Sequence, residues 1–198
     1  METKNKNIEH RTFSYELRAG DGDNERSVSG YAAVFGKRSE NLGGFTEIIQ
    51  EGAFDGALKS SDVRALVNHD PTLLLARSSS GTLDLSIDAT GLMYRFDAPE
   101  TQAGNDLLTL VKRGDLKESS FGFTIDEDKW EENEETGAWT RTILKVKRLY
   151  DVSPVTFPAY PDTSVAQRSL QKVKDEKHPE PEYRKELLEA INESDKLL

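Results

Sequence analysis

The chain has 198 residues, and its 36 acidic side chains against 26 basic ones give a formal net charge of −10. It contains no cysteine, which excludes disulfides, thiolate zinc sites and a cysteine nucleophile, and fits a reducing compartment. No run of about 18 apolar residues and no apolar N-terminal segment occurs, so we expect neither a membrane span nor a secretory signal. The acidic balance, without clustered Lys and Arg, also argues against nucleic acid as a partner.

Alternating apolar residues predict a β-rich domain that begins after a polar N-terminal arm, residues 1–11. We expect a hairpin from residues 13–17 and 28–34, a strand over 45–49 and a short helical turn ending near 58. A strand over 62–68 ends at His69, because Pro71 interrupts regular pairing. The alternation at 83–87 and 92–96 predicts a second hairpin, the clearest in the sequence.

Residues 105–112 carry apolar side chains at helical spacing and are followed by Gly114, which predicts a helix and its C-terminus. A long hairpin is expected from Ser120 to Val155, with the acidic stretch 126–135 at its projecting tip. Residues 167–182 are polar and include two prolines, which predicts a linker. The chain is therefore divided into an arm (1–11), a folded domain (12–166), the linker (167–182) and a C-terminal amphipathic helix (183–198).

The apolar face of the predicted C-terminal helix needs a partner, because a helix this short is marginal alone in water. Three partners are considered: a different protein, a second copy of the chain, or the folded domain of the same chain.

Few residue types in the chain can perform acid–base chemistry. It has three histidines, and two of them, His10 and His178, fall in the predicted ends. His69 is therefore the candidate general base; the alternative is a surface histidine at a strand end. The histidines are scattered and no His-Glu-x-x-His motif or phosphate-binding glycine loop occurs, so we expect no metal and no cofactor.

A serine pair stands where a predicted helix gives way to a strand. Ser119 and Ser120 precede Gly122, whose missing side chain would let a substrate or another backbone approach. The alternative is that the serines begin a strand and Gly122 marks a bulge. No G-x-S-x-G sequence occurs, so an α/β-hydrolase is not indicated.

Five short blocks occur in a fixed order: G-Y-A-A-V-F at 30–35, E-I-I-Q-E-G-A-F at 47–54, N-H-D-P at 68–71, S-S-F-G-F at 119–123 and D-V-S-P-V-T-F-P-A-Y at 151–160. The set resembles the prohead maturation proteases of tailed bacteriophages, which are related in fold to the herpesvirus assemblins. The resemblance covers residues 15–165. It implies a mainly β (α+β) protein, built as a closed, mostly antiparallel β-barrel with flanking helices.

The resemblance also implies a serine endopeptidase. The family nucleophile, just before the F-G-F sequence, falls on Ser120; the family histidine falls on His69; and the acid that opens the last block is Asp151. Herpesvirus relatives use a second histidine as the third member, and the predicted domain holds none, which favours a carboxylate. Alternatives for these roles are Ser119, Asp70 and Asp126.

By the same resemblance, the protein cuts the scaffold, or the scaffolding segment of the major capsid protein precursor, and also itself. The reaction takes place inside the assembling prohead, in the host bacterial cytoplasm. Expected partners are the capsid precursor, the scaffold and a second copy of the chain, with no membrane. Backbone N–H groups of residues 113–116 are the oxyanion donors suggested by analogy. The alternative function is a catalytically inactive assembly module with the same barrel.

Overall fold

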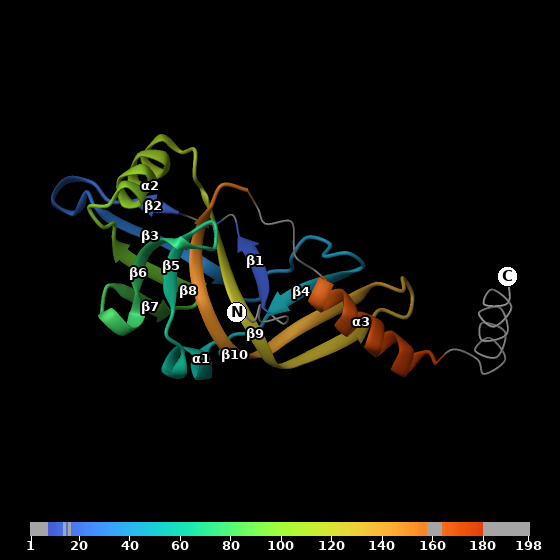
Figure 1. The fold of residues 1–198 in the computed structure, drawn as a ribbon. Helices are drawn as coiled ribbons and strands as arrows, with labels where there is room; N and C mark the ends of the chain where they lie inside the picture. Colours follow the sequence, from blue (N-terminus) through green and yellow to red (C-terminus); the bar gives the residue numbers. More distant parts are fainter. Residues whose placement is uncertain (1–7, 14, 16, 158–163, 180–198) are drawn as a thin grey trace, which may run out of the picture.

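The computed structural model describes residues 8–157, apart from 14 and 16, and residues 164–179. In that part the chain is mainly β, with α-helices around the sheets (Figure 1). The strands are β1 (Glu9–Phe13), β2 (Arg18–Ala19), β3 (Ser27–Val34), β4 (Phe45–Ile49), β5 (Arg64–Val67), β6 (Asp70–Arg77), β7 (Leu83–Ile87), β8 (Gly91–Asp97), β9 (Glu118–Glu132) and β10 (Trp139–Val155). The α-helices are α1 (Asp55–Ser60), α2 (Gln102–Arg113) and α3 (Ser164–Lys177), and short 3₁₀ turns lie at η1 (Gly22–Asn24) and η2 (Ser78–Ser80).

The strands form two sheets. The larger has the order β1-β9-β10-β5-β6, with β4 also paired to β10, and the smaller has the order β2-β3-β8-β7. The antiparallel hairpin of β9 and β10 runs through the middle of the molecule (Figure 1). β10 pairs in parallel with β4 along residues 139–143 and with β5 at residues 151–152. One long strand therefore connects two distant parts of the larger sheet.

The predicted closure into a barrel is not found in the part of the chain that the structure describes. Both sheets are open: β1, β4 and β6 are edges of the larger, and β2 and β7 are those of the smaller. The described pairing is mostly antiparallel, as predicted, apart from the parallel pairs of β10 with β4 and β5. Alternating apolar residues identify strands but not the edges that pair. Register shifts between β9 and β10 add local bends that no alternation pattern reports.

Both sheets, α1 and α2 contribute to one hydrophobic core. Phe121 and Phe123 of β9 are fully buried, as are Leu92 and Tyr94 of β8 from the smaller sheet. α2 adds its apolar face through Leu107 and its neighbours. The core therefore fixes β9, which carries the serine pair, against the smaller sheet.

Two elements expected from local sequence signals are confirmed. The hairpin at 83–87 and 92–96 is β7–β8, and the helix at 105–112 is α2. Thr101 caps this helix by accepting the N–H of Gly104, and Gly114 ends it in the left-handed conformation at φ 77°. The first predicted hairpin is wrong in its pairing, because β1 pairs with β9 and only the short β2 pairs with β3.

α3 occupies much of the region predicted as a linker, so that prediction is wrong for residues 167–177. Ala166 and Leu170 of α3 pack in a second apolar cluster with Phe45 of β4 and Trp139 of β10. The helix lies along the outer part of the β9–β10 hairpin (Figure 1). The described helices include none of the length and apolar character needed to cross a membrane. The predicted C-terminal helix, 183–198, lies outside the described residues.

Candidate active site

Neighbouring strands of the larger sheet bring together the three residues named from the sequence. Ser120 lies on β9, Asp151 on β10, and His69 in the loop between β5 and β6. The register of β9 and β10 places Asp151 opposite Gly122, and Ser153 opposite Ser120. β5 runs parallel to β10 from Asp151 onward, so the loop after β5 reaches the same end of β10.

The loop that carries His69 is a tight two-residue turn. Val67 pairs with Asp70, and the residues between them, Asn68 and His69, have φ angles of 52° and 59°. Positive φ at both central residues is the requirement of a type I′ hairpin turn, which Asn tolerates well. A left-handed conformation costs a non-glycine residue roughly 1–2 kcal/mol, so His69 is held there by its surroundings.

Asn68 binds this turn to β10. Its backbone N–H donates to the carbonyl of Pro154 at 3.0 Å. Its side-chain oxygen accepts from the backbone N–H of Thr156 at 2.9 Å and from the Thr156 hydroxyl at 3.0 Å. These bonds fix the position of the neighbouring imidazole relative to Asp151.

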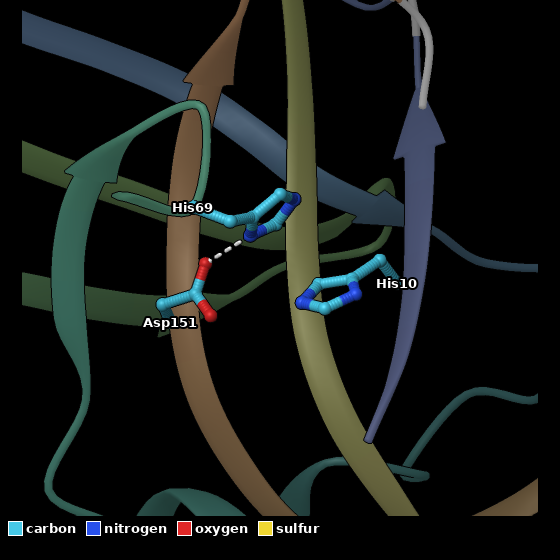
Figure 2. A group of neighbouring side chains, drawn as sticks. All are labelled: His10, His69 and Asp151. Atoms are coloured by element: carbon cyan, nitrogen blue, oxygen red, sulfur yellow. Dashed lines mark hydrogen bonds and ion pairs between the residues drawn. The ribbon is translucent and has the colours of Figure 1, made fainter. Parts of the chain in front are cut away.

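The three side chains form a continuous hydrogen-bonded chain. His69 Nδ1 lies 2.5 Å from Asp151 Oδ1, and His69 Nε2 lies 2.6 Å from Ser120 Oγ. The contact between His69 and Asp151 is the dashed line in Figure 2. Because an ionised carboxylate only accepts hydrogen bonds, Nδ1 carries the proton and Nε2 offers its lone pair to the serine hydroxyl. Ser120 is fully buried and Asp151 is 6 % exposed, whereas the His69 side chain is 17 % exposed and accessible to a reactant.

The alternative residues have other partners. Ser119 Oγ lies 2.8 Å from the Tyr94 hydroxyl, in the core, where burial raises the pKa of Tyr94. Asp70 accepts from the backbone N–H and the hydroxyl of Thr72, and these bonds hold the pKa of Asp70 below its usual value. Asp126 lies further along β9, in a groove beside α3. None of these contacts joins an alternative residue to His69.

Sequence reasoning missed His10, which it placed in a polar arm. His10 lies on β1, opposite Gly122 of β9, and its ring centroid is 4.2 Å from that of His69. A Cβ on Gly122 would lie 2.5 Å from Asp151 Oδ2 and 3.1 Å from His10 Nε2. Glycine at position 122 therefore makes the space in which these two side chains meet. The predicted arm is wrong for residues 9–11, which belong to β1.

Ser153 was also missed. Its hydroxyl donates to Asp151 Oδ1 at 2.7 Å, the same oxygen that faces His69, and it is fully buried. The sequence does contain a signal for this contact. Ser153 follows Asp151 by two residues in the D-V-S-P-V block, and residues two apart on a strand lie on the same face.

The backbone N–H groups suggested as oxyanion donors are engaged at the end of α2. The N–H of Gly114 donates to Val111, and those of Asp115 and Leu116 donate to Leu110. They satisfy the terminal carbonyls of the helix, so these N–H groups are not available to bind an oxyanion.

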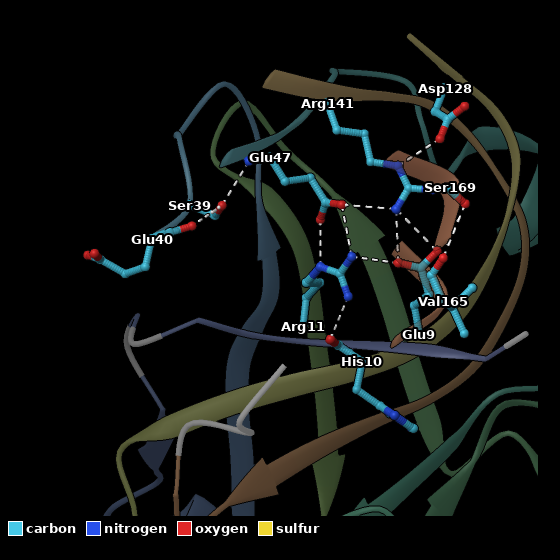
Figure 3. A network of polar contacts seen from close by, with 10 residues as sticks. All are labelled: Glu9, His10, Arg11, Ser39, Glu40, Glu47, Asp128, Arg141, Val165 and Ser169. Atoms are coloured by element: carbon cyan, nitrogen blue, oxygen red, sulfur yellow. Dashed lines mark hydrogen bonds and ion pairs between the residues drawn. The ribbon is translucent and has the colours of Figure 1, made fainter. Parts of the chain in front are cut away.

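A buried network of charges fixes β1 and thereby His10 (Figure 3). The Arg11 guanidinium donates to Glu47 at 2.7 Å and to Glu9 at 2.6 Å, and Arg141 donates to Glu9 at 2.9 Å and to Asp128 at 2.7 Å. Burial lowers the pKa of Arg11 most, but the carboxylates of Glu47 and Glu9 together outweigh it and raise that pKa. The network joins β1, β4, β9 and β10.

A serine, an imidazole and a carboxylate hydrogen-bonded in this order are the side-chain arrangement of the serine hydrolases. The family described as caudovirus prohead serine protease matches residues 13–176 of the sequence. The chain belongs to this family, so it is a serine protease of phage prohead maturation, and the resemblance noted in the sequence is confirmed.

A solved structure of the bacteriophage T4 capsid assembly protease, gp21, has a similar fold, with a TM-score of 0.50. The sequences are 12% identical, and the alignment covers 77% of this chain and 98% of that one. At this identity the likeness concerns the fold alone. A comparison with curated protein sequences gives no match.

Proposed function

We propose that Ser120 is the nucleophile of this protease, His69 its general base and Asp151 the acid that orients the imidazole. The observation that carries the proposal is the unbroken chain of contacts, 2.6 Å from Ser120 Oγ to His69 Nε2 and 2.5 Å from His69 Nδ1 to Asp151 Oδ1. The family itself requires a serine, and Ser120 is the member of the serine pair that faces an imidazole.

In the first half of the reaction, Ser120 Oγ attacks the carbonyl carbon of the scissile peptide bond while its proton moves to His69 Nε2. Asp151 stabilises the imidazolium that forms, because Nδ1–H already points at its carboxylate. The tetrahedral intermediate then collapses. Nε2–H gives its proton to the leaving amine, the C–N bond breaks, and an ester on Ser120 remains.

In the second half, His69 Nε2 takes a proton from a water molecule, whose oxygen attacks the ester carbonyl. The C–O bond to Ser120 breaks, the proton returns to Ser120 Oγ, and a carboxylic acid leaves. The partial exposure of the His69 side chain, 17%, is consistent with access for this water. Both halves need a neutral imidazole at His69, because only its free lone pair can accept the proton.

We infer that the substrates are the major capsid protein precursor or its scaffolding segment, the scaffold, and the protease itself, inside the assembling prohead in the host cytoplasm. The family, caudovirus prohead serine proteases, and the structurally similar T4 protein, a capsid assembly protease, support this choice. Enclosure within a shell would raise the concentration of protease and substrate together, which favours self-association and self-cleavage.

The test is cleavage of purified capsid precursor by the wild-type chain and by Ser120→Ala. We expect the substitution to reduce the rate by roughly 10⁴ to 10⁶, as removal of a nucleophile does. Ser119→Ala is the matched control, since its hydroxyl faces Tyr94 rather than His69. Folded wild-type protein that fails to cut any precursor would favour the inactive assembly module, and cleavage that persists in Ser120→Ala would reject this nucleophile.

A further inference from the structure

Three potential metal ligands from separate parts of the chain meet beside the proposed nucleophile. His10 comes from β1, His69 from the β5–β6 turn and Asp151 from β10, and their ligand atoms all lie within 4.8 Å of one another. Figure 2 shows the three side chains directed toward a common space. Gly122, which has no side chain to fill that space, lies beneath it.

Two imidazoles and one carboxylate form a ligand set that zinc uses in proteins, with bonds of about 2.0–2.2 Å and a fourth position left for water. Ligand atoms around a tetrahedral zinc stand roughly 3.3 Å apart. Atoms that lie within 4.8 Å of one another would need to come closer together by up to about 1.5 Å to bind one ion. The histidines are only partly buried, which leaves a path for the ion to enter.

His10 is held in place by the strand that carries it. Successive residues of a strand point to opposite faces. Glu9 and Arg11 therefore project into the buried charge network, while His10 projects toward His69. Fixing the two neighbours in buried ion pairs reduces the freedom of His10, so less entropy is lost when it binds an ion.

We propose that His10, His69 and Asp151 bind a zinc ion, which switches off the protease. The inhibitory part rests on the proposed function, in which Nε2 of His69 accepts the Ser120 proton. If zinc binds Nε2, the lone pair that the serine needs is occupied. If zinc binds Nδ1, the single proton of the neutral ring moves to Nε2, which then donates to Ser120 and cannot accept. Either geometry removes the general base.

Binding is tested with ZnCl₂ alone on the full-length Ser120→Ala chain, which cannot digest itself. Calorimetry should give one zinc per chain, and His10→Gln in the same background should weaken binding by at least about tenfold, as loss of a ligand requires. His178→Gln is the matched control, because His178 pairs with the carboxylate of Glu132 outside the site and tests for adventitious histidine–carboxylate binding. It should bind zinc as tightly as the parent.

A second measurement serves if His10→Gln does not fold. The chain has three histidines, so NMR of the ring resonances in Ser120→Ala reports each one. Zinc should shift the signals of His10 and His69 and leave that of His178 in place. Absence of saturable binding, equal affinity in His10→Gln, or shifts confined to His178 would each overturn the site.

Inhibition is tested on the wild-type chain with a peptide substrate. Zinc should abolish cleavage in the concentration range in which it binds, and a chelator should restore it. Undiminished cleavage by the zinc-loaded chain would overturn the switch. Reaction of metal-free protein with a fluorophosphonate separates the two proposals. Labelling without zinc binding rejects the metal site alone, whereas zinc binding by a chain that never labels upholds the site and rejects the proposed function.

Discussion

The hydroxyl of Ser153 extends the hydrogen-bonded chain beyond the three residues named from the sequence. It donates to the same Asp151 oxygen that faces His69. Without this donor the carboxylate is free to turn, and its control of the imidazole weakens. We expect Ser153→Ala to lower kcat for a peptide substrate by about tenfold or more, with little change in KM, measured by steady-state kinetics.

Ser119 provides the control for that substitution, because it is another fully buried serine with a different partner. Ser119→Ala leaves the buried Tyr94 hydroxyl without its bond, so it should cost about 1–3 kcal/mol of stability in denaturant unfolding. Its kcat should stay near the wild-type value. Equal losses of kcat in Ser119→Ala and Ser153→Ala would contradict a positioning role for Ser153.

The missing side chain at Gly122 leads to a second prediction at this scale. In Gly122→Ala the new Cβ would stand 2.5 Å from Asp151 Oδ2, so the carboxylate that contacts His69 must shift. We expect a large loss of kcat in a chain that still folds. Gly56→Ala, in α1, meets nothing within 4 Å and should keep full activity. Normal turnover in Gly122→Ala would show that the carboxylate position is not critical.

At the scale of elements, β1 is held by charges rather than by apolar contacts alone. Arg11 faces Glu9 and Glu47, and all three side chains are at most 4% exposed. Arg11→Met leaves both carboxylates without this partner, which should cost about 3–5 kcal/mol in denaturant unfolding. Arg38→Met is the control, since exposed Arg38 donates to two threonine hydroxyls and to no carboxylate among the described residues, and a change within about 0.5 kcal/mol is expected. Similar losses in both variants would reject the role of the network.

The attachment of α3 to the hairpin depends on pH. Hydrogen bonds from His178 and Lys177 lower the pKa of Glu132 below its usual 4.5. A carboxylate with a lowered pKa in the folded state adds stability above its unfolded pKa and loses it as the pH falls through the folded value. The stability difference between wild type and Glu132→Gln should therefore shrink as the pH falls below 4.5.

Denaturant unfolding at a series of pH values measures this difference. Glu131→Gln is the control, because Glu131 pairs with the exposed Lys129 on the same strand and not with α3. A difference for Glu132→Gln that does not change between neutral and acid pH would contradict the assigned bonds.

For the whole molecule, local sequence signals predicted individual helices and strands better than they predicted how the strands pair into sheets. The β7–β8 hairpin and α2 could be identified because a turn, a cap or a strict alternation marks each one. The open sheets and the pairing of β1 with β9 depend on contacts between residues far apart in the chain. No local sequence pattern indicates such contacts. The sequence of α3 resembles a linker because only a few of its residues, such as Ala166 and Leu170, are buried and the others are mostly polar.

For the same reason, the sequence predicted some residues of the candidate site and missed others. His69, Ser120 and Asp151 stand in blocks that carry the family resemblance, and the structure brings them within hydrogen-bond distance. His10 stands between Glu9 and Arg11, and charged residues of this kind are usually solvated. Glu9 and Arg11 are buried because they pair with Glu47 on β4 and Arg141 on β10. These partners are far away in the sequence, so the burial could be recognised only from the structure.

The central claim is that Ser120 is the activated nucleophile, and active-site labelling tests it most directly. The folded wild-type chain is treated with a fluorophosphonate and digested, and the modified serine is located by peptide mass spectrometry. We predict a single label on Ser120, lost in His69→Ala because the hydroxyl is then not deprotonated. A label on Ser119 or Ser153, or none on protein that cuts capsid precursor, would contradict the account.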